Sequence, residues 1–458
     1  MLLMVSLVPA CGGQATLPPV PDSAMVSPTL TSTPVTPLLP PTTGSVFVLP
    51  TVTSTSTPLV IPTFTPVPTL SGEAGVNPGS LIVDELAFLS WQGEDAWLYT
   101  VAVDGSGLTR VSEAVYQWDQ PQWSPDGSAL AFRIDEAEDI SSLYMIRESD
   151  PAPVRVTTGL DVSSYAWSPE SDRIAFSAVV EGEEDIYLLS LDTLAPVNVT
   201  SSQGIVEYEP VWSPTGTQIA FQSASGASSH LVCLGECGYR IYVMDVDSLV
   251  GNRQIWVNPD NLYEGVECDP TWSLDGRYLA LIQGCEIVGN WIPCLFDSQD
   301  GSISQLATDW HFKVWKVDWI SEDELSLFYP HEQADRVTYK DRFYAINRSG
   351  KNMHPLFPGA NLDVAAGSWT SNHRLYAWHD KTSHEIFIGD MTTNQSVSMG
   401  IQGCDPEWSP SGDWLAFTTE CLEEAQESDV WVVRRDGSGL LNLTETVPGD
   451  SSNVAWRP

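Results

Sequence analysis

Basic residues are scarce in this chain. Its 458 residues include 20 Lys and Arg against 60 Asp and Glu, which gives a formal net charge of −40. A surface this negative repels the phosphate backbone of nucleic acids, so we expect no nucleic-acid partner. Cations and basic proteins stay open as partners.

Long apolar runs and catalytic signatures are missing as well. Beyond the N-terminus no stretch of 18 apolar residues occurs, so no transmembrane helix is expected. The chain also lacks the G-x-S-x-G nucleophile motif and the H-E-x-x-H metal motif. Among the seven histidines, His379 and His384 are close enough to be neighbours across a turn between strands. We favour a surface pair over metal ligands at this place.

The chain begins with an apolar run, MLLMVSLVPAC, that ends in small residues and Cys11. It resembles the end of a bacterial lipoprotein signal, with Val8-Pro9-Ala10-Cys11 in the place of the lipobox. The resemblance implies cleavage before Cys11 and acylation of that cysteine. Residues 1–11 are therefore interpreted as a signal for an extracytoplasmic, lipid-anchored protein, and the alternative is an ordinary secretory signal with a chance cysteine.

Residues 12–79 are rich in proline, threonine and serine and carry almost no charge. Such a segment cannot bury a core, so we predict a disordered linker that samples extended polyproline-like conformations. At roughly 3.1 Å per residue it holds a domain on the order of 100 to 200 Å from its anchor.

From residue 80 to 458 the chain repeats a tryptophan, a tight turn and a short apolar strand. The repeated tryptophans are Trp123, Trp167, Trp212, Trp272, Trp319, Trp369, Trp408 and Trp456. A turn such as Ser124-Pro125-Asp126-Gly127 suits a hairpin, because proline presets the first turn residue and glycine accepts a positive φ. A period in the forties with about four strands per unit is typical of a β-propeller.

The two ends of the repeat complement each other. The first apolar triplet, Leu86-Ala87-Phe88, has no tryptophan strand before it, and the last tryptophan strand, Asn453–Trp456, has no triplet after it. We therefore predict an all-β, eight-bladed propeller in which the C-terminal strand completes the first blade. Because the turns after Trp319 and Trp369 are degenerate, seven blades is the alternative.

The phrase WSPDG followed by an apolar triplet, with DGSGLTRVS at 104–112 and DGSGLLNLT at 436–444, resembles the TolB-type propeller repeats. The resemblance spans about residues 80 to 458 and implies the fold. It says little about function, because propellers carry unrelated activities. TolB itself resembles six blades with a separate N-terminal α/β domain, and this chain shows neither.

Two blades share cysteines seventeen positions apart, in CDPTWSLDGRYLALIQGC and CDPEWSPSGDWLAFTTEC. Matching ends of adjacent antiparallel strands lie within disulfide reach, which predicts the bonds Cys268–Cys285 and Cys404–Cys421 and an oxidising compartment. Alternatives are a Cys285–Cys294 bond and a zinc site, although the spacings do not fit paired C-x-x-C motifs. A local bond between Cys233 and Cys237 would leave Cys294 odd.

Three acidic residues, Glu209, Asp269 and Asp405, each stand three positions before a repeated tryptophan and are followed by proline. In related propellers the tryptophan strand is the innermost, which implies that these carboxylates lie near one mouth of the central channel. Carboxylates at one mouth suit Ca²⁺, which prefers oxygen ligands. The favoured alternative is that they cap the strands or accept hydrogen bonds from neighbouring blades. We therefore expect no cofactor, with Ca²⁺ as the alternative.

These observations favour a lipid-anchored, non-catalytic binding protein of the bacterial cell envelope. We expect a monomer that binds an envelope protein, a peptide or a glycan through one channel mouth and the insertion at 223–239, and that meets the membrane only through its N-terminal lipid. The alternative is a metal-dependent polysaccharide lyase or hydrolase, since oligogalacturonate lyases resemble this repeat class. A purely structural surface protein is the third hypothesis.

Overall fold

The computed structural model describes residues 84–458 except 94, 117–118, 137–139, 151, 226–239, 249–252, 255–266, 284–291, 307–313, 315, 330–342, 359–366 and 423–426. All described residues belong to one compact unit, Pro62–Pro458. Within these ranges no helix has the length and apolar character needed to cross a membrane. The predicted signal at 1–11, the linker at 12–79 and most of the insertion at 223–239 lie outside the described residues.

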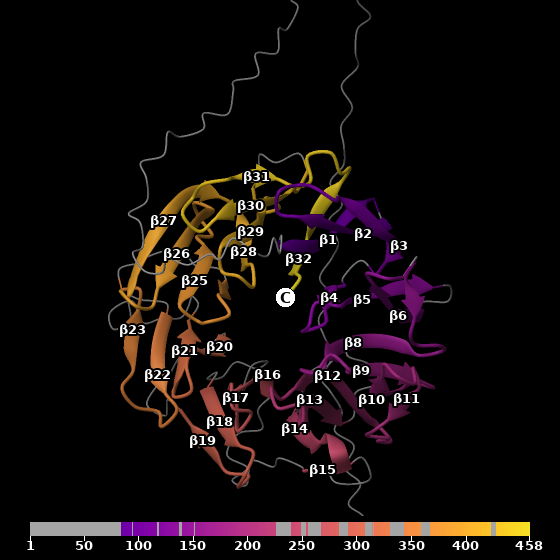
Figure 1. The fold of residues 1–458 in the computed structure, drawn as a ribbon. Coiled ribbons are helices and arrows are strands. Elements are labelled where there is room, and N and C mark those ends of the chain that lie inside the picture. Colours follow the sequence, from indigo (N-terminus) through magenta and orange to yellow (C-terminus); the bar gives the residue numbers. More distant parts are fainter. Residues whose placement is uncertain are drawn as a thin grey trace, which may run out of the picture. The chain divides into compact units, whose positions relative to one another are not determined.

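The described residues form antiparallel blades of four strands, arranged in a ring (Figure 1). The first blade contains β32 (Asp450–Trp456), β1 (Glu85–Gln92), β2 (Asp95–Ala102) and β3 (Thr109–Val115). The second contains β4 (Gln122–Trp123), β5 (Ala129–Glu136), β6 (Ile140–Arg147) and β7 (Val154–Arg155). One residue pair, Val115 and Ile134, joins these two blades into a single sheet.

Three further blades follow in chain order. The third contains β8 (Asp161–Trp167), β9 (Arg173–Val180), β10 (Glu183–Ser190) and β11 (Pro196–Asn198). The fourth contains β12 (Ile205–Trp212), β13 (Gln218–Ser225), β14 (Arg240–Asp245), followed by the short 3-10 helix η1 (Val246–Ser248), and β15 (Arg253–Gln254). The fifth contains β16 (Glu267–Trp272), β17 (Tyr278–Gln283), β18 (Ile292–Asp297) and β19 (Ile303–Gln305).

The last three blades complete the ring. The sixth contains β20 (Lys316–Trp319), β21 (Glu324–Phe328), β22 (Phe343–Asn347) and β23 (His354–Leu356). The seventh contains β24 (Ser368–Trp369), β25 (Leu375–His379), β26 (Glu385–Asp390) and β27 (Gln395–Gln402). The eighth contains β28 (Cys404–Trp408), β29 (Trp414–Thr418), β30 (Val430–Arg434) and β31 (Leu441–Asn442).

The prediction of eight blades closed by the C-terminal strand is confirmed. Strand β32 pairs antiparallel with β1, with Trp456 opposite Leu86. Arg457 extends the closure, because its Nη1 lies 2.7 Å from a carboxylate oxygen of Glu85 and its Nε donates to the carbonyl of Gly127 at 2.8 Å. The degenerate turns after Trp319 and Trp369 belong to genuine blades, so the seven-bladed alternative is wrong.

In five of the eight repeats a serine follows the tryptophan and holds the turn, as the second blade shows. The Ser124 backbone carbonyl accepts a hydrogen bond from the Gly127 amide at 2.7 Å, and the Ser124 hydroxyl accepts one from the Ala129 amide at 3.0 Å. The same hydroxyl donates to Asp126 Oδ1 at 2.6 Å. Gly127 has a φ of 67°, which glycine adopts without strain. The sequence S-P-D-G thus supplies the side chains and the glycine that close the turn, and the Ala129 amide completes it.

The repeated tryptophans link neighbouring blades. In six of them the indole N–H donates to the backbone carbonyl of the residue just before the tryptophan of the preceding blade, at 3.0 to 3.3 Å. The pairs are Trp123 to Ala455, Trp167 to Gln122, Trp212 to Ala166, Trp272 to Val211, Trp319 to Thr271 and Trp456 to Glu407. Among the described residues, the buried indole nitrogens of Trp369 and Trp408 have no hydrogen-bond partner.

The core lies between the blades, where the second strand of each blade is covered on both sides. The phenylalanine that ends the apolar triplet stacks on a tyrosine directly opposite on the third strand, with ring centroids 5.4 to 6.4 Å apart in the first four blades. The pairs are Phe88 with Tyr99, Phe132 with Tyr144, Phe176 with Tyr187 and Phe221 with Tyr242. All four phenylalanines are fully buried, so aromatic packing contributes to the interfaces of these four blades.

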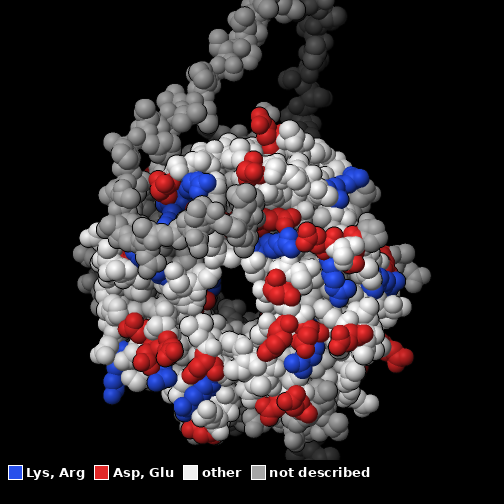
Figure 2. All heavy atoms as spheres, viewed as in Figure 1, with Lys and Arg blue, Asp and Glu red and all other residues white. Residues whose placement is uncertain are grey.

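The surface carries the acidic excess of the sequence. Figure 2 shows a hollow at the centre of the ring and acidic side chains on the blades around it. The first strand of each blade lies at this centre, as the positions of β4, β20 and β28 show in Figure 1. The channel is therefore lined by the segments that lead into the repeated tryptophans.

Candidate functional site

The innermost strands are irregular just before their tryptophans. Strands β12, β16 and β28 shift register at the acidic residue and the proline that follows it, at Glu209, Asp269 and Asp405. Glu209 and Asp405 have φ values of 53° and 47°, a left-handed conformation that residues other than glycine rarely adopt. Proline has no amide hydrogen for the ladder, which explains why a bulge forms there.

The bulge at Glu209 is tied to the preceding blade. Its backbone amide donates to the hydroxyl of Ser164 at 3.0 Å, and its carboxylate accepts a hydrogen bond from the Gln222 side chain. We expected the side chain of this residue to contact a neighbouring blade, but the backbone amide makes that contact. The Glu209 side chain is exposed to solvent.

The bulge at Asp405 makes the equivalent contact with the seventh blade. Its backbone amide donates to Nδ1 of His379 at 3.2 Å. Two neighbouring carboxyls are affected by their surroundings: desolvation, together with Asp405, raises the pKa of Glu420, and desolvation raises the pKa of Glu407 to about 7. Asp405 adds to this rise at Glu407, and Lys316 opposes it. Glu407 is accessible to solvent, yet the surrounding protein desolvates its carboxyl. This combination is expected for a side chain that lines a channel.

Glu209 and Asp405 occupy equivalent positions on the fourth and eighth blades. In a ring of eight, these blades lie on opposite sides of the channel. The backbone of Asp269 belongs to β16 on the fifth blade, and its side chain lies outside the described residues. Joint binding of Ca²⁺ by these carboxylates therefore stays a prediction.

One of the predicted disulfides is present: Cys404 and Cys421 are bonded, with their Cα atoms 6.1 Å apart. Cys404 begins β28 and Cys421 follows β29, so the bond joins matching ends of two adjacent strands, as expected. Cys294 is buried in β18. The predicted bonds of Cys268 with Cys285 and of Cys233 with Cys237, and the alternative bond to Cys285, lie outside the described side chains.

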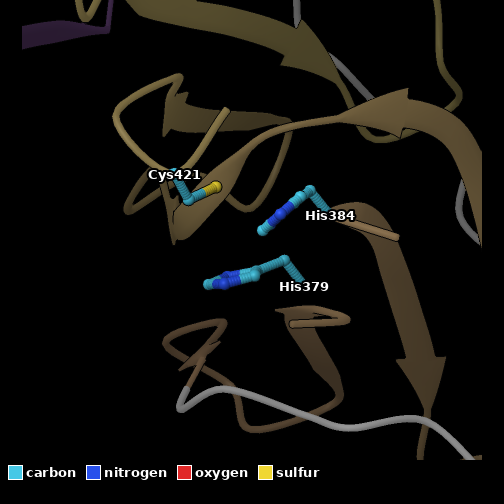
Figure 3. A group of neighbouring side chains, drawn as sticks. All are labelled: His379, His384 and Cys421. Atoms are coloured by element: carbon cyan, nitrogen blue, oxygen red, sulfur yellow. The ribbon is translucent and has the colours of Figure 1, made fainter. Parts of the chain in front are cut away.

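The two histidines singled out in the sequence lie beside this disulfide. His379 ends β25 and His384 precedes β26, and their ring centroids are 6.4 Å apart. Figure 3 shows both rings extending toward Cys421. One ligand-type atom from each of His379, His384 and Cys421 lies within 4.8 Å of the others. The interpretation of the histidines as a surface pair is wrong for His379, whose side chain is 6% exposed.

Burial affects the protonation of His379 and the hydrogen bonding of His384. Desolvation lowers the pKa of His379, which favours the neutral imidazole, and Asp405 acts against that shift. Nδ1 of His384 is buried and, within the described part of the chain, has no hydrogen-bond partner. Both histidines therefore bring ring nitrogen atoms into a largely desolvated place, and at His379 the lowered pKa favours the neutral ring.

Sequence reasoning considered the histidines and the cysteines separately and missed this cluster. The blade order is the signal that could have shown their proximity. The His379–His384 hairpin belongs to the seventh blade, and Cys404 and Cys421 belong to the eighth. Equivalent loops of consecutive blades are neighbours in a propeller.

The fold and its repeats define a class, the closed propellers built from W-S-P-D-G-type blades. No family model matches the chain. An uncharacterized protein of Agrobacterium fabrum is 30% identical over 332 residues, which cover 68% of this chain and 88% of that protein. The chain therefore belongs to the TolB-like β-propeller family together with this Agrobacterium protein.

Relatives that carry the TolB name match over shorter stretches. The Tol-Pal system protein TolB of Francisella tularensis is 28% identical over 155 residues, 33% of this chain and 35% of that protein. A TolB homolog of Chlorobium luteolum is 31% identical over 146 residues, 32% of this chain and 33% of that protein. The chain thus spans about a third of the length of these relatives.

Solved structures support the fold alone. A prolyl endopeptidase structure aligns with a TM-score of 0.52 at 10% identity, covering 79% of this chain and 49% of that one. A eukaryotic initiation factor structure aligns with a TM-score of 0.52 at 11% identity, covering 82% of this chain and 98% of that one. These two proteins differ in kind, so the shared propeller says nothing about activity.

Proposed function

We propose that this protein is a lipid-anchored binding protein of the bacterial envelope that holds its partner at the acidic channel mouth and performs no chemistry of its own. The observation that carries the proposal is the pair of exposed carboxylates, Glu209 and Asp405, each on a bulge with a positive φ. Unfavourable backbone conformations persist where the surrounding structure holds them, and they concentrate at ligand-binding positions.

The charge of the chain points to the class of partner. A formal charge of −40 and acidic groups around the central hollow attract cationic ligands and raise their rate of association. We propose a basic segment of an envelope protein or peptide as the main partner. A glycan held by hydrogen bonds is the other outcome that the experiment below distinguishes.

The proposed location rests on two supports. The Cys404–Cys421 disulfide suits an oxidising compartment outside the cytoplasm. The apolar stretch before Cys11, with the proline-rich segment after it, suits an anchor and a spacer. A Cys11→Ser variant, expressed in a bacterial host, should lose incorporation of labelled fatty acid and leave the membrane fraction. Unchanged labelling of that variant would exclude Cys11 as the anchor.

Zero-length crosslinking of carboxylates to amines tests the mouth. In cells that produce the full chain, the wild type should form a crosslinked product with an envelope protein. The double variant Glu209→Gln, Asp405→Asn should lose that product. An Asp192→Asn variant, which changes an exposed carboxylate after β10, serves as the matched control and should keep it.

Equal products from all three proteins would remove the mouth as the binding surface. If no protein product forms, a glycan array probed with the wild type and the double variant decides between a glycan ligand and no ligand. Glycan binding that the double variant loses would keep the mouth and change the partner class.

A metal-dependent polysaccharide lyase or hydrolase is the second candidate. Its support is the electrostatic contact of Glu407 with Lys316 and Asp405 on the innermost strands, since carboxylates beside a lysine are groups that such enzymes use. Incubation of the full chain with polygalacturonate and Ca²⁺ or Mn²⁺ tests it. Release of unsaturated or reducing ends that Glu407→Gln abolishes would establish the enzyme, and no release removes it.

A further inference from the structure

The junction of the seventh and eighth blades gathers four residues of the two types, histidine and cysteine, that suit soft or borderline metal ions. His379 and His384 come from the hairpin between β25 and β26, Cys404 begins β28, and Cys421 follows β29. Ligand-type atoms of His379, His384 and Cys421 lie within 4.8 Å of one another, and Cys404 is bonded to Cys421 (Figure 3). Three segments of the chain thus converge on one small volume.

Backbone hydrogen bonds fix Cys404 between the two histidines. The amide on one side of it, from Gly403, donates to the carbonyl of His384 at 2.8 Å. The amide on the other side, from Asp405, donates to Nδ1 of His379 at 3.2 Å. The Cys421 amide in turn donates to Sγ of Cys404 at 3.0 Å. These contacts do not depend on the sulfur–sulfur bond, so reduction leaves a scaffold that keeps the four residues together.

We propose that His379, His384, Cys404 and Cys421 form a tetrahedral site for a zinc-class divalent ion when the disulfide is reduced. Two thiolates and two imidazoles are the donor set of many four-coordinate zinc sites. Such soft and borderline ligands select Zn²⁺ over the hard cations Ca²⁺ and Mg²⁺. The cluster uses none of the carboxylates proposed to hold the partner, although it adjoins one of them, because Asp405 follows Cys404 and its amide contacts His379.

The two states exclude each other because a disulfide sulfur has no thiolate to offer. A dithiol reductant supplies two electrons and two protons, the bond between Cys404 and Cys421 breaks, and the reductant leaves as its own disulfide. Each of the two thiols then releases one proton as its sulfur binds the ion. A disulfide oxidant then takes two electrons from the two thiolates and two protons from solvent and leaves as its own dithiol, so the bond between Cys404 and Cys421 reforms and the ion is released.

The surroundings of the histidines suit this exchange. Nδ1 of His384 is buried without a hydrogen-bond partner among the described residues, so a bound ion would satisfy a nitrogen that is otherwise uncompensated. Nδ1 of His379 accepts the Asp405 amide and therefore carries the lone pair of the neutral ring. Metal binding at that lone pair replaces the hydrogen bond from Asp405, while the bond from the Gly403 amide to the His384 carbonyl still holds Cys404 beside the hairpin.

Cobalt titration of the full chain tests the site, because Co²⁺ reports tetrahedral thiolate coordination by its visible and charge-transfer absorption. The wild type, reduced with a phosphine reductant, should bind one ion with this signature, and the oxidised wild type should not. His384→Ala keeps every cysteine and should weaken the binding tenfold or more. His373→Ala changes another half-buried histidine of the seventh blade and should bind like the wild type.

Alkylation of the wild type gives a second measurement that needs no variant to fold. Zn²⁺ should protect Cys404 and Cys421 of the reduced chain from iodoacetamide, and a chelator should remove the protection, as mass spectrometry of the two peptides will show. The proposal is overturned if the reduced chain binds no Co²⁺, if the oxidised chain binds it equally well, if His384→Ala retains the spectrum and affinity, or if Zn²⁺ leaves both cysteines reactive.

Discussion

The indole N–H of Trp123 on the second blade donates to the backbone carbonyl of Ala455, 332 residues further along the chain, at 3.2 Å. This contact joins the second blade to the C-terminal strand of the first. The guanidinium of Arg457 lies over the same indole, 5.1 Å from the ring centroid, and adds a cation–π interaction. In six of the eight blades the repeated tryptophan is thus hydrogen-bonded to the blade before it.

Replacing one bonded tryptophan should cost more stability than replacing an unbonded one. Trp167 and Trp408 are 8% and 5% exposed, but only Trp167 donates a hydrogen bond, to Gln122. Trp167→Phe leaves that carbonyl without its donor, so it should destabilise the fold by about 1 kcal/mol more than Trp408→Phe. Chemical denaturation followed by fluorescence measures both. Equal losses would mean that the tryptophan is repeated for its volume alone.

A buried ion pair joins the segment before β4 to β5 in the second blade. Asp119 is fully buried, and its carboxylate contacts Nε of Arg133 at 2.9 Å. Asp119→Asn should cost about 3 kcal/mol, because the guanidinium stays buried without its counter-charge. The exposed pair Arg348–Asp323, also at 2.9 Å, provides the control, and Asp323→Asn should cost under about 1 kcal/mol. Similar losses for the two variants would contradict the effect of burial.

The turn carboxylates should make stability depend on acid pH. Hydrogen bonds from Ser124 and Ser128 lower the pKa of Asp126 from 3.8 to about 2. Because the folded state favours the ionised form of Asp126, this carboxylate stabilises the fold. Its contribution to the free energy of unfolding is complete above about pH 4 and is lost as the pH falls toward 2. Since Asp126 is exposed, solvent screening limits the contribution to roughly 1 kcal/mol.

Asp126→Asn should therefore be less stable than the wild type at pH 6, and the difference should shrink toward pH 2. Asp192→Asn, which removes the same charge at another exposed position, should show no such convergence. Thermal melting at a series of pH values measures both variants. A constant difference for Asp126→Asn across the range would refute the prediction.

The Cys404–Cys421 bond should stabilise the eighth blade. The bond closes a loop with a sequence separation of 17, for which the loss of chain entropy in the unfolded state is worth about 3 kcal/mol. The double variant Cys404→Ser, Cys421→Ser should lose this amount in denaturation without reductant. With reductant the wild type loses the bond as well, so the two proteins should then approach each other. A difference that reductant leaves untouched would point to packing.

The sequence by itself determined the fold of this protein. The pattern of a blade consists of residues close together in the sequence: a tryptophan, a turn such as the serine-proline turn at 124–127, and an apolar triplet. Such short-range patterns can be recognised without coordinates. The complementary ends of the repeat also predicted that Asn453–Trp456 would pair with Leu86–Phe88. The matched spacing of Cys404 and Cys421 predicted their bond, since strand register fixes which residues face each other.

Tertiary structure decided what lies between blades. The His379–His384 hairpin meets Cys421 only because the ring places the seventh blade against the eighth, and no local pattern encodes that contact. In the same way, the acceptor for six of the repeated tryptophans is a backbone carbonyl of another blade, which a sequence cannot display. Glu209 and Asp405 share one sequence pattern, yet ring geometry sets them on opposite sides of the channel. The spacing of residues along the chain predicts each blade. The sites form between blades, because residues distant in sequence meet only when successive blades pack against each other in the ring.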